Sequence, residues 1–141
     1  MTSEFKPNNP LEEKLLALYR KEIRIIEFLE LLIESQVVIL ADRDVDISRP
    51  SMYFNPLAIT SPMGFDVLVT FSSLERAKAA LARYPKYPCA MAVNTKWFLQ
   101  GAYENAGFAL NPGWPFGFEL APEGLQQMLL RFGVKKLSGQ N

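Results

Sequence analysis

The sequence contains no histidine and only one cysteine, Cys89. The absence of histidine excludes Ser/His/Asp and Cys/His catalytic groups and every zinc site that depends on imidazole. A single cysteine cannot form an intramolecular disulfide, so the chain lacks the crosslinks typical of oxidising compartments, and we expect a cytoplasmic protein. The immediate neighbours of Cys89, Pro88 and Ala90, carry no charge that would lower the pKa of the thiol. We therefore expect Cys89 to be buried and structural.

Long uncharged segments are also scarce. The longest, residues 50–65, is interrupted by Pro56 and Pro62, and residues 1–9 contain no apolar stretch of the kind found in signal peptides. Fifteen Lys and Arg balance fifteen Asp and Glu, so no net positive field attracts the chain to nucleic acid or to an anionic membrane. We therefore expect neither a nucleic-acid partner nor a membrane-bound protein.

The common cofactor motifs are missing as well. No glycine-rich phosphate-binding motif occurs, and the stretch 113–117 places large aromatic residues where a phosphate cradle needs exposed backbone amides. The alternating aspartates of residues 42–46 resemble the first half of a calcium loop. However, the sixth and twelfth positions of that loop are Ile47 and Tyr53 in place of Gly and Glu. We interpret this segment as a solvated loop, and we expect no cofactor and no metal.

What is present fits one globular domain. The chain has 141 residues, of which 49% are hydrophobic and 21% are charged, and both values are ordinary for a single packed core. We expect a disordered N-terminus at residues 1–8, a single domain at 9–133 and a flexible tail at 134–141.

Helix signals recur along the chain. Asn9 with Pro10 predicts a helix start, and the apolar spacing continues to residue 33 with an expected break near Arg20. Ser72 followed by Glu75 has the spacing of a capping box and predicts a helix that ends before residue 85. Further helices are expected from residues 94 and 122, the last of them ending at residue 133.

Short apolar runs between these helices predict strands, at residues 36–40, 57–60, 66–71, 89–93, 108–110 and 118–120. The continuous apolarity of 36–40 favours a central strand buried on both faces. Residues 57–60 and 66–71 are expected to form a hairpin, and the strand–helix alternation from 66 to 110 predicts right-handed crossovers. We therefore predict an α+β fold with a mixed sheet of about five strands flanked by helices.

Large aromatic residues are concentrated in two short segments. Tyr87 lies between prolines ahead of a predicted strand, and Trp114 and Phe116 lie in the turn-rich segment 111–117. Residues of this type on an ordered loop anchor protein interfaces, so we expect Trp114, Phe116 and Tyr87 to bind a partner. The alternative is that Trp114 and Phe116 fold back as a cover over the core.

Three segments carry a resemblance to a known family: Asn9-Pro10-Leu11-Glu12, Phe71-Ser72-Ser73-Leu74-Glu75, and residues 110–120 leading into Pro122-Glu123. The chain resembles the SseB family over roughly residues 9–133, specifically the N-terminal domain of the enhanced serine sensitivity protein. The resemblance implies an SseB-like fold in a small bacterial cytoplasmic protein without an established catalytic site. It also implies that longer members have a C-terminal domain that these 141 residues lack.

Two functional hypotheses follow. The first is a non-enzymatic interaction or regulatory module that binds a protein partner or itself through the aromatic loop. The second is a small-molecule binding protein or enzyme linked to amino-acid metabolism, that of serine as the family name suggests, with Cys89, Asp66 or Glu119 lining a pocket. A closed pocket of convergent polar groups favours the second hypothesis, and an exposed apolar surface favours the first.

Overall fold

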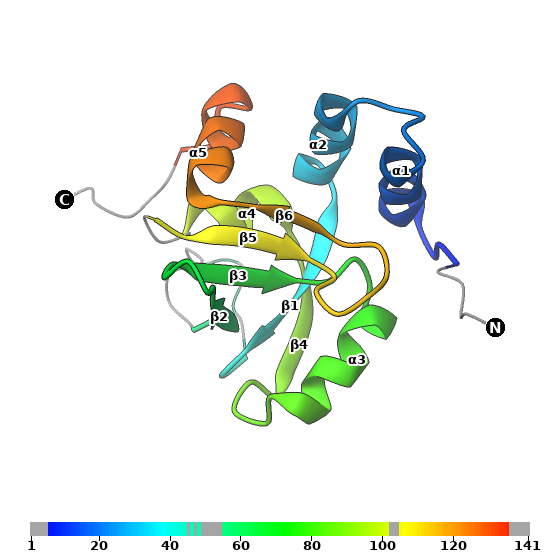
Figure 1. Cartoon of the computed structure of the whole chain (residues 1–141). Coiled ribbons are helices and arrows are strands. Elements are labelled where there is room, and N and C mark those ends of the chain that lie inside the picture. The colour runs from blue at the N-terminus through cyan, green and yellow to red at the C-terminus, as the bar shows by residue number, and fades with distance from the viewer. Residues whose placement is uncertain (1–5, 45, 47, 49–54, 102–104, 136–141) are drawn as a thin grey trace.

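The computed structural model describes residues 6–44, 46, 48, 55–101 and 105–135 (Figure 1). The elements of this part follow in the order α1 (Pro10–Tyr19), α2 (Ile25–Ile33), β1 (Gln36–Ala41), β2 (Ala58–Thr60), β3 (Asp66–Thr70), α3 (Leu74–Arg83), β4 (Cys89–Asn94), α4 (Thr95–Gln100), β5 (Gly107–Leu110), β6 (Phe118–Leu120) and α5 (Pro122–Arg131). The predicted α+β class with a mixed sheet is confirmed.

The predicted start and break of the first helical segment are confirmed. The Asn9 side chain accepts a hydrogen bond from the Glu12 backbone N–H at 2.9 Å, a cap typically worth about 1 kcal/mol. Helix α1 ends at Tyr19 with Arg20 as its C-cap, and Lys21 adopts a left-handed backbone with φ of 62°. This turn redirects the chain, so α2 begins at Ile25 and packs beside α1.

Strand β1 is buried on both faces, as predicted, and connects two sheets. Along one edge it pairs antiparallel with β4. Along the other, Val38 exchanges backbone hydrogen bonds with Phe71, at 2.7 and 2.8 Å, and the Leu40 carbonyl accepts from Leu57 at 2.8 Å. These bonds place β1 between β4 and the β2–β3 hairpin.

The second sheet has the order β2-β3-β5-β6. The β2–β3 hairpin is confirmed, and β3 runs parallel to β5. The prediction of successive crossovers through residues 89–93 is wrong, however, because β4 leaves this sheet and pairs with β1. Local strand and helix signals do not specify pairing, and the continuous apolar surface of β1 provides β4 with a buried partner.

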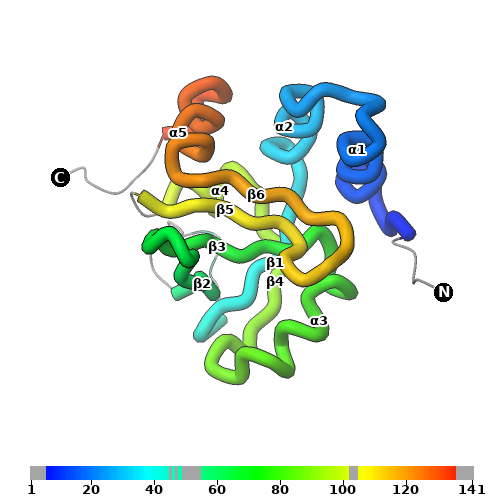
Figure 2. The backbone as a smooth tube through the Cα atoms, in the orientation of Figure 1, coloured from blue at the N-terminus to red at the C-terminus, as the bar shows by residue number. Residues whose placement is uncertain are grey.

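Two hydrophobic clusters form the interior. The larger lies between the four-stranded sheet and helices α1, α2, α4 and α5, and includes the tilted ring pair of Phe28 and Phe118, whose centroids are 4.9 Å apart. The smaller lies where α3 packs on β1, and is built around Val38, Leu40 and Ala77. The backbone trace shows α3 on one side of the molecule and α1, α2 and α5 on the other (Figure 2).

The predicted terminal segments fall partly outside the described residues, which exclude 1–5 and 136–141. Within the described part, the Lys6 carbonyl accepts a hydrogen bond from Arg76, and Asn8 donates to Glu12 and Glu75. At the other end, Val134 is buried. Residues on both sides of the predicted domain therefore contact its folded part.

Candidate functional site

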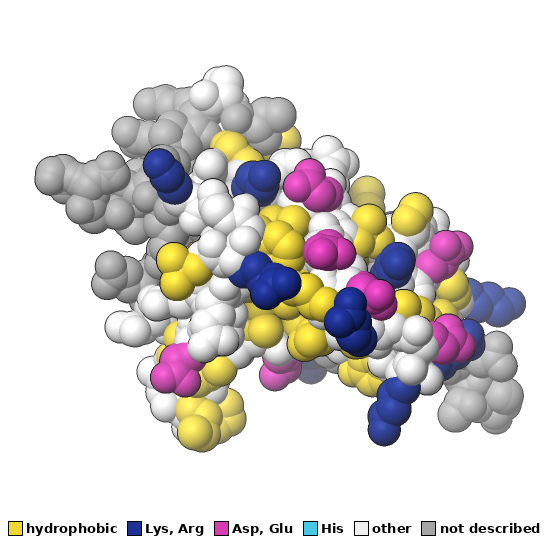
Figure 3. Space-filling model, turned by 90° about the horizontal axis from the view of Figure 1, so that it is seen from above, with side chains coloured by type: hydrophobic (Ala, Val, Ile, Leu, Met, Phe, Trp, Pro, Cys, Tyr) yellow, Lys and Arg dark blue, Asp and Glu magenta, His cyan; other side chains and the backbone are white. Residues whose placement is uncertain are grey.

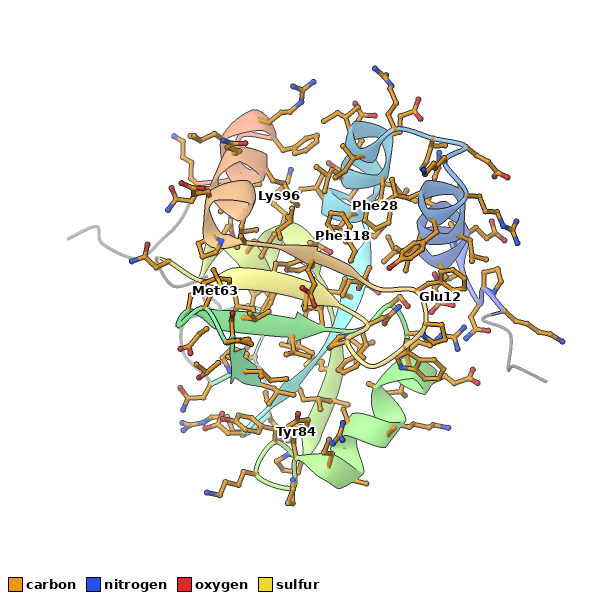
Figure 4. The ribbon with its side chains drawn as sticks, viewed as in Figure 1. Glu12, Phe28, Met63, Tyr84, Lys96 and Phe118 are labelled. Atoms are coloured by element: carbon orange, nitrogen blue, oxygen red, sulfur yellow. The ribbon has the colours of Figure 1, made fainter. Side chains whose placement is uncertain are left out.

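The three segments that carry the family resemblance meet in space. The start of α1, the junction of β3 with α3, and the loop between β5 and β6 converge on a buried group of polar side chains. Figure 4 shows Glu12, on α1, on the side of the molecule where this loop lies. We call residues 111–117 the aromatic loop, and these polar groups hold it in place.

At the centre is an ion pair between Glu12 and Arg76. The Glu12 side chain is 0% exposed and that of Arg76 is 6% exposed. The guanidinium donates to both carboxylate oxygens, from Nη2 at 3.0 Å and from Nε at 3.1 Å. This two-point geometry is the strong form of an arginine–carboxylate contact.

Three further groups form hydrogen bonds with this ion pair. The Ser72 hydroxyl and the Asn8 backbone N–H donate to the Glu12 carboxylate, and Arg76 donates from Nη2 to the Lys6 carbonyl at 2.5 Å. Burial acts to raise the pKa of the Glu12 carboxyl. The hydrogen bonds from Arg76, Ser72 and Asn8, together with the charge of Arg76, outweigh burial and lower that pKa below its usual value. Glu12 is therefore ionised at neutral pH.

Asn111 connects this group to the aromatic loop. Its side chain accepts from the Ser72 backbone N–H at 2.9 Å and donates to the Ser72 hydroxyl at 2.8 Å. Its own backbone N–H donates to the Thr70 carbonyl at 2.8 Å, and its φ is 57°. Asparagine tolerates this left-handed conformation better than most residues do, so it suits the sharp turn where β5 ends.

The aromatic residues of the loop fold back onto the protein. The Trp114 indole N–H donates to the Arg76 carbonyl at 3.0 Å, and the Arg76 guanidinium lies 4.7 Å from the centre of the indole ring. Phe116 packs edge-on against Tyr19 at 4.8 Å. Both rings are half-buried, so they cover the core as the alternative interpretation proposed, while part of each remains accessible.

Backbone contacts fix the end of the loop. The Tyr19 hydroxyl donates to the Gly117 carbonyl at 2.7 Å and accepts from the Gly117 N–H at 3.2 Å. A Cβ at Gly117 would lie 2.9 Å from the Leu110 carbonyl oxygen, so only glycine fits this close approach. The loop is therefore held at its beginning, at Trp114 and at its end.

An open hollow lies between the aromatic loop and α3, and we call it the α3 hollow. Its volume is about 470 Å³. Apolar and aromatic groups form most of its wall, and Arg83 is its exposed basic residue. The lining residues are Ile59, Val69, Phe71, Arg76, Ala79, Ala80, Arg83, Tyr84, Pro112, Gly113 and Trp114.

A second hollow of about 300 Å³ continues from the first across the four-stranded sheet. The two share Ile59, Val69 and Pro112. Glu119, on β6, lines the second hollow, and Arg83, on α3, lines the first. Together the two hollows form a mainly apolar surface with one exposed basic and one exposed acidic residue.

The sequence-predicted binding residues do not form one patch. Trp114 lines the α3 hollow, whereas Phe116 packs on Tyr19. Tyr87 is half-buried beyond the end of α3 and packs against the smaller hydrophobic cluster. Of the three, Trp114 alone lines the α3 hollow.

The residues proposed for the enzyme hypothesis are also separated. Glu119 lines the second hollow, while Asp66 begins β3 and accepts a hydrogen bond from the Thr60 hydroxyl at 3.2 Å. Cys89, at the start of β4, lies 3.6 Å from an Asp44 carboxylate oxygen. Neither Asp66 nor Cys89 lines either hollow, so the structure does not bring these three groups together.

The prediction that Cys89 is buried is wrong, because the residue is only half-buried. Its partial burial, followed by the hydrogen bond to Asp44 and the negative charges of Asp44 and Asp42, raises the pKa of the thiol. A raised pKa keeps the thiol protonated at neutral pH and makes it a weak nucleophile.

The aspartate-rich loop is partly defined. Asp42 accepts from the Asn55 backbone N–H at 3.0 Å and from the Asn55 side chain and Arg43, and these bonds lower the pKa of Asp42 to about 2. Ile47 and Tyr53, which argued against a calcium loop, lie outside the described residues. Within the described part of the chain, no group of three or more Cys, Asp and Glu side chains is placed to hold a metal ion.

Sequence reasoning missed the buried network. It assigned Glu12 to a helix start and Ser72 to a cap. In the structure Ser73 caps α3, by accepting from the Arg76 N–H at 3.3 Å, and Ser72 turns inward. One sequence signal did point to these residues. Glu12 and Ser72 both lie within segments that carry the family resemblance, and Arg76 follows one of these segments directly.

The fold and site thus define an α+β domain whose aromatic loop is anchored by a buried ion pair. Over residues 11–127 the chain matches the family described as SseB protein N-terminal domain. Because this match covers most of the chain, the protein belongs to the SseB family. Neither the curated proteins nor the solved structures give a significant match. Among the helices of the described residues, none has the length and apolarity needed to span a membrane.

Proposed function

We propose that this SseB-family domain is a non-enzymatic, cytoplasmic protein-interaction module, and that a segment of a partner protein binds in the α3 hollow. The observation that carries the proposal is the anchoring of the aromatic wall. Trp114 is held by Arg76, which is itself held by Glu12. A surface that is already ordered loses little conformational entropy on binding, so its apolar area is available for affinity.

The chemistry of the wall favours a protein segment over a reaction. Ile59 is 37% exposed, and it lines both hollows together with Val69 and Pro112. Exposed apolar groups of this kind contribute to interfaces when a partner removes them from water. The polar groups proposed for catalysis lie on different elements, so they provide no convergent constellation for acid–base chemistry.

The three predicted binding residues take different parts in this proposal. Trp114 contacts the bound segment directly from the wall of the hollow. Phe116 positions the loop through its contact with Tyr19. Tyr87 lies near the end of α3 where its backbone N–H donates to the carbonyl of Tyr84, a lining residue, at 3.0 Å, and it extends the surface beyond the hollow.

The charge pattern on the face formed by α1, α2 and α5 fits a protein partner better than a nucleic acid. Seen from above, Lys and Arg side chains are interspersed with Asp and Glu over α1, α2 and α5, around hydrophobic groups (Figure 3). Nucleic-acid binding relies on a continuous basic surface. The single cysteine of the sequence supports the proposed cytoplasmic location, because the cytoplasm is a reducing compartment.

Binding of a small molecule related to amino-acid metabolism is the second candidate function. The volume of the α3 hollow, about 470 Å³, falls within the range of roughly 300 to 1,000 Å³ that ligand sites occupy. Its openness to solvent and mainly apolar wall count against this candidate, because small polar ligands are usually enclosed and contacted by several polar groups.

The experiment is a capture of partners from native cytosol with the tagged wild-type protein and with variants of the hollow. Ile59→Asp places a charge on the apolar surface, and Arg83→Glu reverses the basic rim. Lys78→Glu is the matched control, because Lys78 is exposed on the same helix and does not line the hollow. All variants are first checked for an unchanged melting temperature.

The proposal expects a partner that Ile59→Asp loses, Arg83→Glu weakens and Lys78→Glu retains. An identical set of captured proteins for all four chains contradicts it. A small molecule that raises the melting temperature of the wild type but not of Ile59→Asp, with no partner captured, favours the second candidate.

A further inference from the structure

Strand β4 has one edge that is not paired. In an antiparallel ladder, the backbone groups of successive residues point alternately toward opposite neighbours. In β1, the backbone groups of Val38 and Leu40 form hydrogen bonds with Phe71 and Leu57, so they point away from β4. Their opposite residues in β4, Ala92 and Ala90, therefore direct their N–H and C=O groups away from β1.

These outward groups have no hydrogen-bond partner among the described residues. The strand also lacks the features that usually protect an edge. Its sequence, Cys-Ala-Met-Ala-Val-Asn, contains no charged residue, proline or glycine. The edge of β4 thus offers two donors and two acceptors to an added strand.

A separate hollow lies beside this edge. Its volume is about 560 Å³, and we call it the β4 hollow. None of its lining residues is charged: they are Asn9, Pro10, Leu11, Leu31, Ser35, Gln36, Val38, Ser72, Ser73, Leu74, Ala90 and Ala92. Leu74 is 53% exposed at its border, although leucine is normally buried.

We propose that the β4 edge and the β4 hollow together bind an extended, uncharged segment of a partner protein that has large apolar side chains at alternate positions. The segment adds a strand antiparallel or parallel to β4, with its main chain bonded to Ala90 and Ala92. Every second side chain then points to the face on which Ala90 and Ala92 line the hollow. Main-chain bonds supply affinity, and the hollow selects the side chains.

The size and charge of the hollow determine the occupant. A second copy of this chain, pairing through its own β4, would present the methyl groups of Ala90 and Ala92 to a hollow of about 560 Å³ and leave it largely unfilled. Charged side chains would lose water against an uncharged wall without gaining a counter-ion. A segment with large apolar residues satisfies both conditions.

This surface is independent of the proposed function. The β4 hollow and the α3 hollow have no lining residue in common. Binding at one can therefore fail while binding at the other succeeds.

The test uses a synthetic heptapeptide, acetylated and amidated, with leucine at alternate positions and threonine between them. A second peptide of the same sequence carries N-methyl groups on the amides that would pair with β4. Binding is measured by isothermal titration calorimetry, and the contact is located from the NMR shifts of the Ala90 and Ala92 amides. The full chain is used throughout.

Two variants separate edge pairing from other contacts. Ala92→Pro removes one outward donor and no bond to β1, because the Ala92 N–H points away from that strand. Ala92→Ser is the matched control, since it keeps this donor. Leu74→Lys adds a charge at the border of the hollow without altering the strand, so it tests the proposal even if Ala92→Pro does not fold.

We expect the leucine peptide to shift the Ala90 and Ala92 amides, and Ala92→Pro and Leu74→Lys to weaken binding by about tenfold or more. Ala92→Ser binds as the wild type does. The proposal is overturned if the leucine peptide leaves these amides unmoved, or if the N-methylated peptide binds equally well. It is also overturned if sedimentation shows a wild-type dimer that Ala92→Pro dissociates, because the occupant is then a second copy.

Discussion

Glu12 and Arg76, which are 64 residues apart in the sequence, form a buried two-point ion pair with N–O distances of 3.0 and 3.1 Å. The pair joins α1 to α3, and the Arg76 guanidinium also lies against Trp114. One contact thus connects the first helix, the third helix and the aromatic loop. The free energy of this ion pair therefore determines how stably the wall of the α3 hollow is held in place.

Glu12→Ala should destabilise the protein by about 3–5 kcal/mol, because it leaves the Arg76 charge buried without its partner. Urea unfolding at neutral pH measures this change. Glu13→Ala is the control, since Glu13 is exposed on the same helix turn, and its effect should stay within about 0.5 kcal/mol. Equal effects for the two variants would show that the ion pair is not formed in solution.

Stability should fall in acid, partly because of Glu12. Its pKa is lower in the folded protein than in the unfolded chain, so ionised Glu12 contributes stability above its unfolded pKa of about 4.3. That contribution is lost as the pH falls through the lower, folded value. We therefore expect the difference in unfolding free energy between wild type and Glu12→Gln to be constant near neutrality and to shrink below about pH 4.

Denaturation of both chains across this range provides the check. Asp42, whose folded pKa is about 2, is present in both and cancels in the comparison. A difference between the chains that does not change from neutral pH to pH 3 would contradict the assignment of a lowered pKa to Glu12.

Trp114 should contribute to stability as well as to binding. Trp114→Phe keeps a ring over Arg76 but removes the hydrogen bond to the Arg76 carbonyl, and should cost about 1 kcal/mol. Trp114→Ala also removes the ring, and should cost more, up to about 3 kcal/mol. Thermal unfolding measures both. Two variants as stable as the wild type would mean that the indole does not hold the loop.

The Cys89 thiol should react slowly at neutral pH. The carboxylate of Asp44, 3.6 Å from the sulfur, contributes to the raised pKa of this thiol. Asp44→Asn should therefore increase the thiolate fraction and accelerate labelling by a thiol–disulfide exchange reagent. The rates are compared in the folded state and normalised to those in denaturant. Rapid labelling of the wild type, unchanged in Asp44→Asn, would exclude this electrostatic effect.

Much of the fold was predictable because its signals are local. The Asn9 cap, the break at Arg20 and the β2–β3 hairpin each depend on a few neighbouring residues, and each is confirmed. The pairing of β4 with β1 was not predictable, because it depends on which apolar surfaces meet when the chain folds. The sequence of residues 89–93 alone does not distinguish these partners.

The site was harder to predict for the same reason. The sequence indicated Trp114 and Phe116 as candidate binding residues. It did not show that Arg76 contacts Trp114 or that Tyr19 packs against Phe116. Glu12 and Ser72 each had a sufficient local explanation, as parts of helix starts. Both residues become buried only when α1 and α3 come together, and no local sequence pattern indicates that contact.

The most direct test of the central claim is hydrogen exchange of the aromatic loop in the wild type and in Glu12→Gln. The claim is that the buried ion pair holds the loop, so the variant should lose protection at the Trp114 N–H, which donates to the Asn111 carbonyl, and at the Gly117 N–H. The Leu57 N–H, which is buried and donates to the Leu40 carbonyl at 2.8 Å, reports on global opening. Selective loss of protection in the loop is the predicted result. Equal protection of the loop in both proteins, or an equal loss at Leu57, would contradict the claim.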